Sequence, residues 1–297
     1  MNIIGKYKNG NYAVTLLSDG TKIRETEEDE FIPSFAENCD MKITDKCDGG
    51  CPFCYEGCTP NGRHGDILNY KFLDTLHPYT ELAINGNDLS HPDLVTFMHK
   101  MKEKKIILNM TVNQIHFERH FNALKEWIDM GLIYGLGVSL KEPTDDFINK
   151  IIQFPNAVIH VINGVVSVHD LARLSGHNLK VLILGYKHLR RGESYYEQND
   201  EIVNALQEDL DKYLFPEIIN NGWFKVVSFD NLAIKQLHVQ KHLPEEQWEE
   251  FYMGDDGNYT FYIDMVDGAF GKNSLATERY PIMDSIDEMF QKILNER

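Results

Sequence analysis

Four cysteines lie close together in the stretch DKCDGGCPFCYEGCTP at positions 45–60, while the only other cysteine, Cys39, stands apart. The four are Cys47, Cys51, Cys54 and Cys58. Clustered cysteines in a reducing compartment are typical of metal ligands or redox groups rather than disulfides. The stretch therefore predicts a metal centre. It is either a structural zinc ion, bound by all four thiols or by three and His64, or an iron–sulfur cluster.

The spacing favours the iron–sulfur cluster. Zinc sites made of cysteine pairs usually separate the two pairs by a dozen or more residues, and no cysteine follows Cys58. The first three cysteines have the spacing C-x3-C-x2-C. Gly49, Gly50 and Pro52 between them would let a short loop turn sharply around one cluster.

This loop, with Phe53 just before its third cysteine, resembles the radical S-adenosylmethionine (radical SAM) enzyme family of the C-x3-C-x2-C type. The resemblance implies a [4Fe–4S] cluster bound by Cys47, Cys51 and Cys54, with one iron open to S-adenosylmethionine. It also implies reductive cleavage of that cofactor to a 5′-deoxyadenosyl radical, which abstracts hydrogen from a substrate. An electron donor such as a flavodoxin or ferredoxin would be a partner. Cys58 is a candidate catalytic residue, and a shielded loop thiol is the alternative.

The resemblance also implies contacts to S-adenosylmethionine at the ends of the expected strands. Where the family has a Gly-Gly-Glu-like motif, this chain has Asn85-Gly86-Asn87-Asp88, so either Asn87 or Asp88 would meet the amino group. The other cofactor-binding candidates are Phe53, Tyr55, Asn113, Ser139, Lys141, Asn163 and Gly185. Turn formation is the alternative role for the Asn, Ser and Gly residues among them.

Six strand-like runs alternate with helix-like segments after residue 39, which predicts parallel strands joined by right-handed crossovers. The runs cover residues 40–44, 81–85, 105–112, 133–140, 157–163 and 179–185. We expect an α/β fold with a partial (β/α)6 TIM-like barrel over residues 39–215. A small β-hairpin and acidic connector would form residues 1–38, and an irregular extension covering the barrel would form residues 216–297. The hairpin and the extension would shield the barrel mouth.

Composition limits the partners and the location. The formal net charge of −17 disfavours nucleic acid, and the one basic cluster, residues 186–192, is expected to be a solvated loop. His116 and His120 have helical spacing and are expected on a solvated helix face. No run of about 18 apolar residues would span a membrane, and the first twenty residues do not read as a secretion signal. We therefore expect a cytoplasmic protein.

Three functions remain open from the sequence. The first is a radical SAM enzyme acting on a peptide or protein side chain, since the edge of the N-terminal hairpin could pair with an extended peptide. The second is a radical SAM enzyme acting on a nucleotide or another small metabolite. The third is a zinc-binding module without catalysis.

Overall fold

A large parallel sheet organises the fold in the computed structural model, which describes residues 2–295. Over these residues its ten strands follow the order β10-β9-β8-β7-β6-β5-β4-β11-β12-β13, and all strands from β10 to β11 run parallel. The strands are β4 (Asn38–Lys42), β5 (Glu81–Asn87), β6 (Ile107–Asn113), β7 (Gly135–Ser139), β8 (Ala157–Ile162), β9 (Lys180–Leu184), β10 (Val226–Phe229), β11 (Thr260–Asp264), β12 (Ala269–Gly271) and β13 (Tyr280–Pro281). The six predicted strands are β4 to β9, so the prediction of a parallel α/β fold is confirmed.

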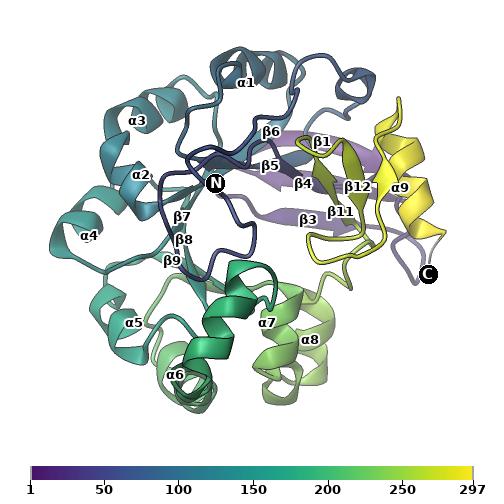
Figure 1. Ribbon diagram of the computed structural model, residues 1–297. Helices are drawn as coiled ribbons and strands as arrows, with labels where there is room; N and C mark the ends of the chain where they lie inside the picture. Colours follow the sequence, from purple (N-terminus) through teal and green to yellow (C-terminus); the bar gives the residue numbers. More distant parts are fainter. Residues whose placement is uncertain (1, 296–297) are drawn as a thin grey trace.

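Helices follow most of these strands and lie around the outside of the sheet (Figure 1). They are α1 (Leu94–Glu103), α2 (Gln114–Arg119), α3 (Phe121–Asp129), α4 (Asp145–Ile151), α5 (Val168–Leu174), α6 (Arg191–Tyr213), α7 (Asn231–Gln236), α8 (Glu245–Phe251) and α9 (Ile286–Leu294). Local sequence fixes where several begin. The side chain of Thr144 accepts a hydrogen bond from the backbone N–H of Phe147 at the start of α4, and Ser167 and Asp170 form a capping box on α5.

The two faces of the sheet differ in polarity. Along β5, Leu82 and Ile84 are buried on the outer face, whereas Asn85 lines a cavity on the inner face together with Thr111 of β6. Side chains alternate between faces along a strand, so each strand contributes to both. The outer face and the helices form the apolar core, which leaves the inner face available for polar side chains.

The C-terminal part of the chain differs from the irregular cover predicted for residues 216–297. β10 pairs with β9 at one edge, and β11 pairs with β4 at the other side of the parallel array. Both strands are therefore part of the main sheet. Within residues 2–295, β10 and β11 do not pair with each other, and the sheet does not close into a complete barrel.

A separate three-stranded antiparallel sheet forms the N-terminal part of the chain, with β1 (Ile3–Asn9), β2 (Tyr12–Leu17) and β3 (Lys22–Glu25). The predicted hairpin is β2 and β3, and β1 is a third strand that the prediction missed. The turn between β2 and β3 contacts residues at the beginnings of the parallel strands. Tyr134, before β7, donates a 3.0 Å hydrogen bond to the carbonyl of Leu17, and Lys180 of β9 donates one of 3.2 Å to the carbonyl of Asp19.

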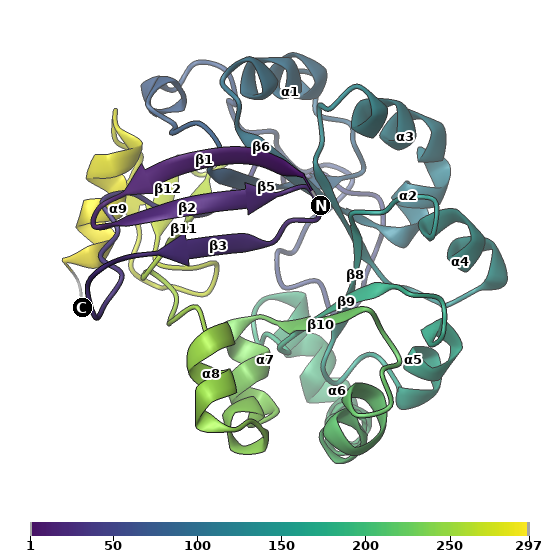
Figure 2. The same cartoon turned by 180° about the vertical axis from the view of Figure 1, so that it is seen from behind.

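This small sheet therefore crosses the amino-terminal end of the parallel strands (Figure 2). The cysteine loop follows the carboxyl end of β4, at the opposite end of the strands. The prediction that the hairpin shields the mouth beside the cysteines is therefore wrong. Its polar contacts reach the strand beginnings instead, so it closes the far end of the inner space.

A buried carboxylate joins the small sheet to the large one. Glu37, directly before β4, is 1% exposed. It accepts hydrogen bonds from Arg24 of β3 at 2.6 and 2.8 Å and from the Tyr12 hydroxyl of β2 at 2.7 Å, and Lys22 lies 3.5 Å away. Burial acts to raise the pKa of Glu37, but the hydrogen bonds from Arg24 and the charge of Lys22 outweigh it and lower that pKa.

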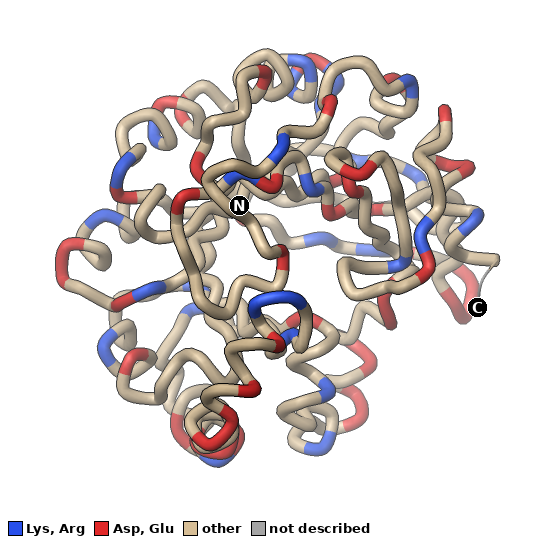
Figure 3. Tube along the Cα trace, viewed as in Figure 1, with Lys and Arg blue, Asp and Glu red and all other residues tan. Residues whose placement is uncertain are grey.

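Charged residues of both signs are interspersed over the exterior helices in the view of Figure 3. Across residues 2–295, no helix combines the length and the apolar character that crossing a bilayer would need.

Replacing Glu37 with Gln should lower the free energy of unfolding by about 3 kcal/mol, because Arg24 would keep a buried charge without its carboxylate, while Lys22 keeps only Glu81. A carboxyl group with a lowered folded pKa stabilises the protein above its unfolded pKa, and that stability is lost as the pH falls through the folded pKa. The deficit of E37Q should therefore be complete above the ordinary value of 4.5 and shrink below it. Urea unfolding from pH 3 to 8 measures this, with exposed Glu103→Gln as control. A deficit that grows as the pH falls would contradict it.

Candidate functional site

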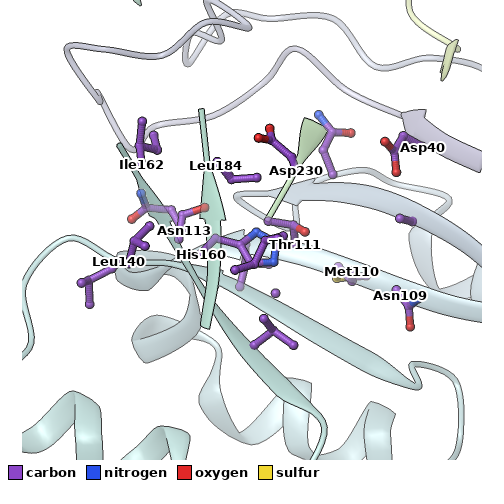
Figure 4. Close-up of a pocket in the computed structure, with 18 of the residues that line it drawn as sticks. Asp40, Asn109, Met110, Thr111, Asn113, Leu140, His160, Ile162, Leu184 and Asp230 are labelled. Carbon is purple, nitrogen blue, oxygen red and sulfur yellow. The ribbon is translucent and has the colours of Figure 1, made fainter. Parts of the chain in front are cut away.

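A cavity of about 940 Å³ lies on the inner face of the parallel sheet. Residues from β4 to β10 line it, and so do the thiols of Cys47, Cys51, Cys54 and Cys58. Figure 4 shows side chains from several strands directed into this space, with Thr111 and His160 close together. The cavity therefore joins the cysteine loop to the polar inner face of the sheet, and its size suits small-molecule binding.

The cysteine loop is closed on itself by backbone contacts. Thr44 and His64 form one bridge and Lys46 and Thr59 another, and the N–H of Cys47 donates to the carbonyl of Thr59 at 2.9 Å. Gly62 must lack a side chain, because a Cβ there would lie 2.1 Å from the carbonyl oxygen of Asp45. Contacts within residues 44–64 therefore hold the shape of the cysteine loop without a metal.

Each of the three C-x3-C-x2-C sulfurs lies near N–H donors. The backbone N–H of Gly49 lies 3.4 Å from Cys47 Sγ, and the Asn113 amide lies 3.3 Å from Cys51 Sγ. Burial raises the pKa of Cys47 and of Cys51. A hydrogen bond from the Cys58 thiol lowers the pKa of Cys54, and nearby backbone N–H groups act in the same direction. Such donors stabilise thiolate charge, which is the form of cysteine that binds iron.

The Asn85-Gly86-Asn87-Asp88 motif at the end of β5 holds the start of the cysteine loop. Asn85 Oδ1 accepts from the N–H of Ile43 at 2.7 Å, and its amide donates to the carbonyl of Thr44 at 2.9 Å. Asn87 donates to the carbonyls of Thr44 and Lys46 and lies 3.4 Å from Cys58 Sγ. Both side chains line the cavity, so their amides position the loop that carries the thiols.

The other two residues of that motif lie outside the cavity lining. A Cβ at Gly86 would lie 2.9 Å from Met110, which shows that this position packs against β6. Asp88 accepts hydrogen bonds from the N–H and hydroxyl of Ser90 and closes its own turn. The sequence left open whether Asn87 or Asp88 would meet the amino group of S-adenosylmethionine. The cavity lining includes Asn87 and leaves out Asp88.

The remaining candidates divide in the same way. Those that line the cavity are Phe53, Tyr55, Asn113, Ser139, Lys141 and Gly185. Asn163 does not. It is 1% exposed and donates to Gln236 at 3.2 Å. Gly185 donates its N–H to Asp230, and a side chain there would collide with Leu232, so its glycine is required by the start of α7.

Two arginines that the sequence did not single out hold the cysteine loop from the other side. Arg191 donates to the carbonyls of Cys51 at 3.1 Å and Cys58 at 2.9 Å. Arg190 donates to the carbonyl of Glu56 at 2.5 Å. Both belong to the basic stretch 186–192. Arg191 is partly buried, so the prediction of a solvated loop is wrong for it, while Arg190 stays exposed. We call this pair the arginine clamp.

Aromatic contacts reinforce the clamp. Lys187 Nζ lies 4.1 Å from the centre of the Tyr55 ring, and the rings of Phe53 and Tyr195 meet edge to face at 5.9 Å. Each contact joins the segment after β9 to the cysteine loop. In the sequence, the run of basic residues after the strand at 179–185 was the only sign of these contacts.

A buried histidine lies under the same loop. His116 is fully buried and hydrogen-bonded to Asp48, and Arg119 donates to the other oxygen of Asp48 at 2.7 Å. Hydrogen bonds from His116 and Arg119 lower the pKa of Asp48 to about 2. The prediction that His116 lies on a solvated helix face is therefore wrong, because the residue next to Cys47 covers it.

Lys42 holds two points of the cysteine loop by charge. Its ammonium is 3% exposed and lies 2.6 Å from Asp45, 3.0 Å from Asp264 and 3.6 Å from Glu56. Asp45 precedes Cys47, and Glu56 lies between Cys54 and Cys58. A single buried cation therefore joins two points of the loop to β11.

The positions of the possible metal ligands in the structure decide whether a metal site is preformed. Across the described residues, 2–295, no group of three or more His, Cys, Asp or Glu side chains is arranged to hold a metal ion. His64 Nδ1 is instead hydrogen-bonded to the Thr44 hydroxyl at 2.9 Å, so it is engaged in closing the loop.

Comparison with known proteins gives a fold relationship. No family model and no curated protein matches this chain. Among solved structures it is similar to Streptococcus suis SuiB bound to S-adenosylmethionine, with a TM-score of 0.52 and 13% identity over 87% of this chain. A second structure of Streptococcus suis SuiB gives a TM-score of 0.53 and 14% identity over 87% of this chain. This chain spans 64% and 66% of the SuiB chains, and at such identities the likeness shows a shared fold.

Replacing Arg191 with Gln should expose the cysteine loop, because two charge-assisted hydrogen bonds to its carbonyls are lost. In protein without metal we expect Cys58, which is 5% exposed, to be alkylated by iodoacetamide about tenfold faster or more. Peptide mass spectrometry over time measures this. Arg173→Gln on α5 is the control, since Arg173 binds Pro143 and Asp145 away from the loop. An unchanged Cys58 rate in R191Q would show that the clamp does not hold the loop.

Proposed function

We propose that this protein is a radical SAM enzyme built on a partial TIM-like barrel, and that Cys47, Cys51 and Cys54 hold a [4Fe–4S] cluster. The observation that carries the proposal is that these three thiols, spaced C-x3-C-x2-C, line one cavity at the carboxyl ends of parallel strands. In parallel α/β folds that end of the strands gathers functional groups. The fold shared with SuiB, solved with S-adenosylmethionine bound, adds support.

The donor set fits such a cluster. All four cysteines line the cavity. Cys47, Cys51 and Cys54 have N–H groups near their sulfurs, and Cys58 is buried against Asn87 and the Cys54 sulfur. The burial of Cys58 favours a supporting loop thiol over a catalytic role. When bound, the cluster would supply the electron that splits S-adenosylmethionine into methionine and a 5′-deoxyadenosyl radical, which abstracts hydrogen from the substrate.

The chain itself would bind and orient the cofactor and exclude water. Asn113, Ser139 and Lys141 lie at the ends of β6 and β7 and line the cavity; they would contact the ribose and carboxylate of S-adenosylmethionine. Phe53 and Tyr55 would flank it from the loop. The small sheet closes the far end of the cavity, which would keep solvent from a reactive intermediate.

For the substrate we favour a peptide or protein side chain over a nucleotide. Asp40 and Asp230 line the cavity, and their carboxylates would repel phosphate. The electron donor would be a flavodoxin or ferredoxin, and the protein would act in the cytoplasm. A zinc-binding module without catalysis leaves the large cavity without a purpose, so it is not favoured.

Anaerobic reconstitution with iron and sulfide tests the function. The wild-type protein should turn brown, bind about four irons per chain, and form 5′-deoxyadenosine when dithionite and S-adenosylmethionine are added. Replacing Cys47, Cys51 or Cys54 with Ser should abolish both iron retention and 5′-deoxyadenosine. The matched control Cys58→Ser should keep the cluster. A colourless zinc protein would contradict the cluster, and a loaded cluster without 5′-deoxyadenosine would contradict the enzymatic function.

A further inference from the structure

The proposed function leaves two carboxylates in the cavity unexplained. Asp40 lies on β4 and Asp230 follows β10, and Figure 4 shows both directed into the cavity. The ion pairs found among residues 2–295 include neither of them. One oxygen of Asp230 caps α7 by accepting from the N–H groups of Gly185 and Ala233. Its negative charge, like that of Asp40, has no cation in contact.

Four other acidic residues line the cavity, and each has local partners. Asp170 belongs to the capping box of α5, and Asp19 accepts from the N–H of Thr21 in the turn of the small sheet. The remaining two are neutralised by cations. Glu81 lies 2.8 Å from Lys22, and Glu56 lies 3.6 Å from both Lys42 and Arg190. Asp40 is exposed within the cavity and Asp230 is partly exposed. Neither carboxylate has a cation in contact, so both are accessible to a ligand that carries one.

Lys187, whose charge acts on both carboxyl groups, forms no ion pair with either among residues 2–295. Lys187 is held over the Tyr55 ring and donates to the Ser274 hydroxyl at 3.1 Å. Its charge lowers the pKa of both carboxyl groups, yet burial, the largest effect, and repulsion from Asp256 leave the pKa of each raised. The ammonium of Lys187 is therefore engaged with Tyr55 and Ser274 rather than with either carboxylate.

His160 adds a third group in the same space. Its ring lies against Gly137, where a Cβ would come within 2.5 Å of it, and near Thr111. No hydrogen bond from elsewhere in residues 2–295 reaches this imidazole, and burial lowers its pKa to about 4. A neutral imidazole can accept a hydrogen bond. The cavity therefore offers acceptors, two of them charged, to a group that donates.

We propose that Asp40 and Asp230 form the recognition site for a cationic group of the substrate, an ammonium or guanidinium. Ammonium carries three N–H donors and guanidinium five, all without an acceptor, which matches carboxylates and a neutral imidazole. This inference rests on the proposed function for the reaction, but the binding itself needs no cluster. The cation arises either from a lysine or arginine side chain or from a free amine.

Binding of matched neutral and charged probes tests the site. Isothermal titration of the full chain, with saturating S-adenosylmethionine, should detect N-acetyl-arginine methylamide and much weaker binding of its neutral isostere, N-acetyl-citrulline methylamide. Asp40→Asn and Asp230→Asn should each weaken the arginine probe about tenfold or more. Agmatine and N-acetyl-lysine methylamide are two further probes. Tighter binding of agmatine than of the two peptide-like probes would assign the site to a free amine.

The controls separate charge from position. Glu103→Gln changes the net charge by the same amount on the exposed end of α1 and should leave probe binding unchanged. Asn keeps the helix cap that Asp230 provides, so D230N serves if D40N does not fold. Equal binding of the citrulline probe, or wild-type affinity in both variants, would overturn the site. Loss of S-adenosylmethionine affinity with normal arginine binding would assign the carboxylates to the cofactor instead.

The same titrations on protein before and after iron reconstitution keep the two proposals apart. Cation binding without any formation of 5′-deoxyadenosine would leave the recognition site standing and remove the radical function. Formation of 5′-deoxyadenosine without cation binding would do the reverse.

Discussion

The cysteine loop must hold several thiols in one place, although a short loop has little core of its own. Its backbone carbonyls and sulfurs are hydrogen-bonded from three directions: Asn85 and Asn87 at the end of β5, Asn113 at the end of β6, and Arg191 at the start of α6. Buried carbonyl groups need such partners. The loop therefore gets its shape from the parallel sheet, and every strand end that meets it acts as a support.

The same sheet makes the cavity possible. Apolar side chains on its outer face pack against the helices, so the inner face does not have to supply the core. Asn85, Thr111 and His160 can then face an open space. The small N-terminal sheet closes that space at the strand beginnings, where Glu37 joins the two sheets through Arg24.

Charge is distributed unevenly around this space. Near the cysteine loop, Arg190, Arg191 and Lys42 bring positive charge to carbonyls and carboxylates. Asp40 on β4 and Asp230 after β10 bring negative charge to the same cavity without contacting cations. An anionic cluster would favour the first set of residues and a cationic substrate group the second, so one cavity suits different ligands.

The sequence by itself determined the parallel α/β fold and singled out the cysteine loop, because strand periodicity and cysteine spacing are local. It could not determine that β10 and β11 extend the sheet, since pairing joins residues such as Cys39 and Phe261 that are far apart in the chain. Nor could it find the arginine clamp or the burial of His116. Both depend on which loops meet at one end of the strands, and only the tertiary structure decides that.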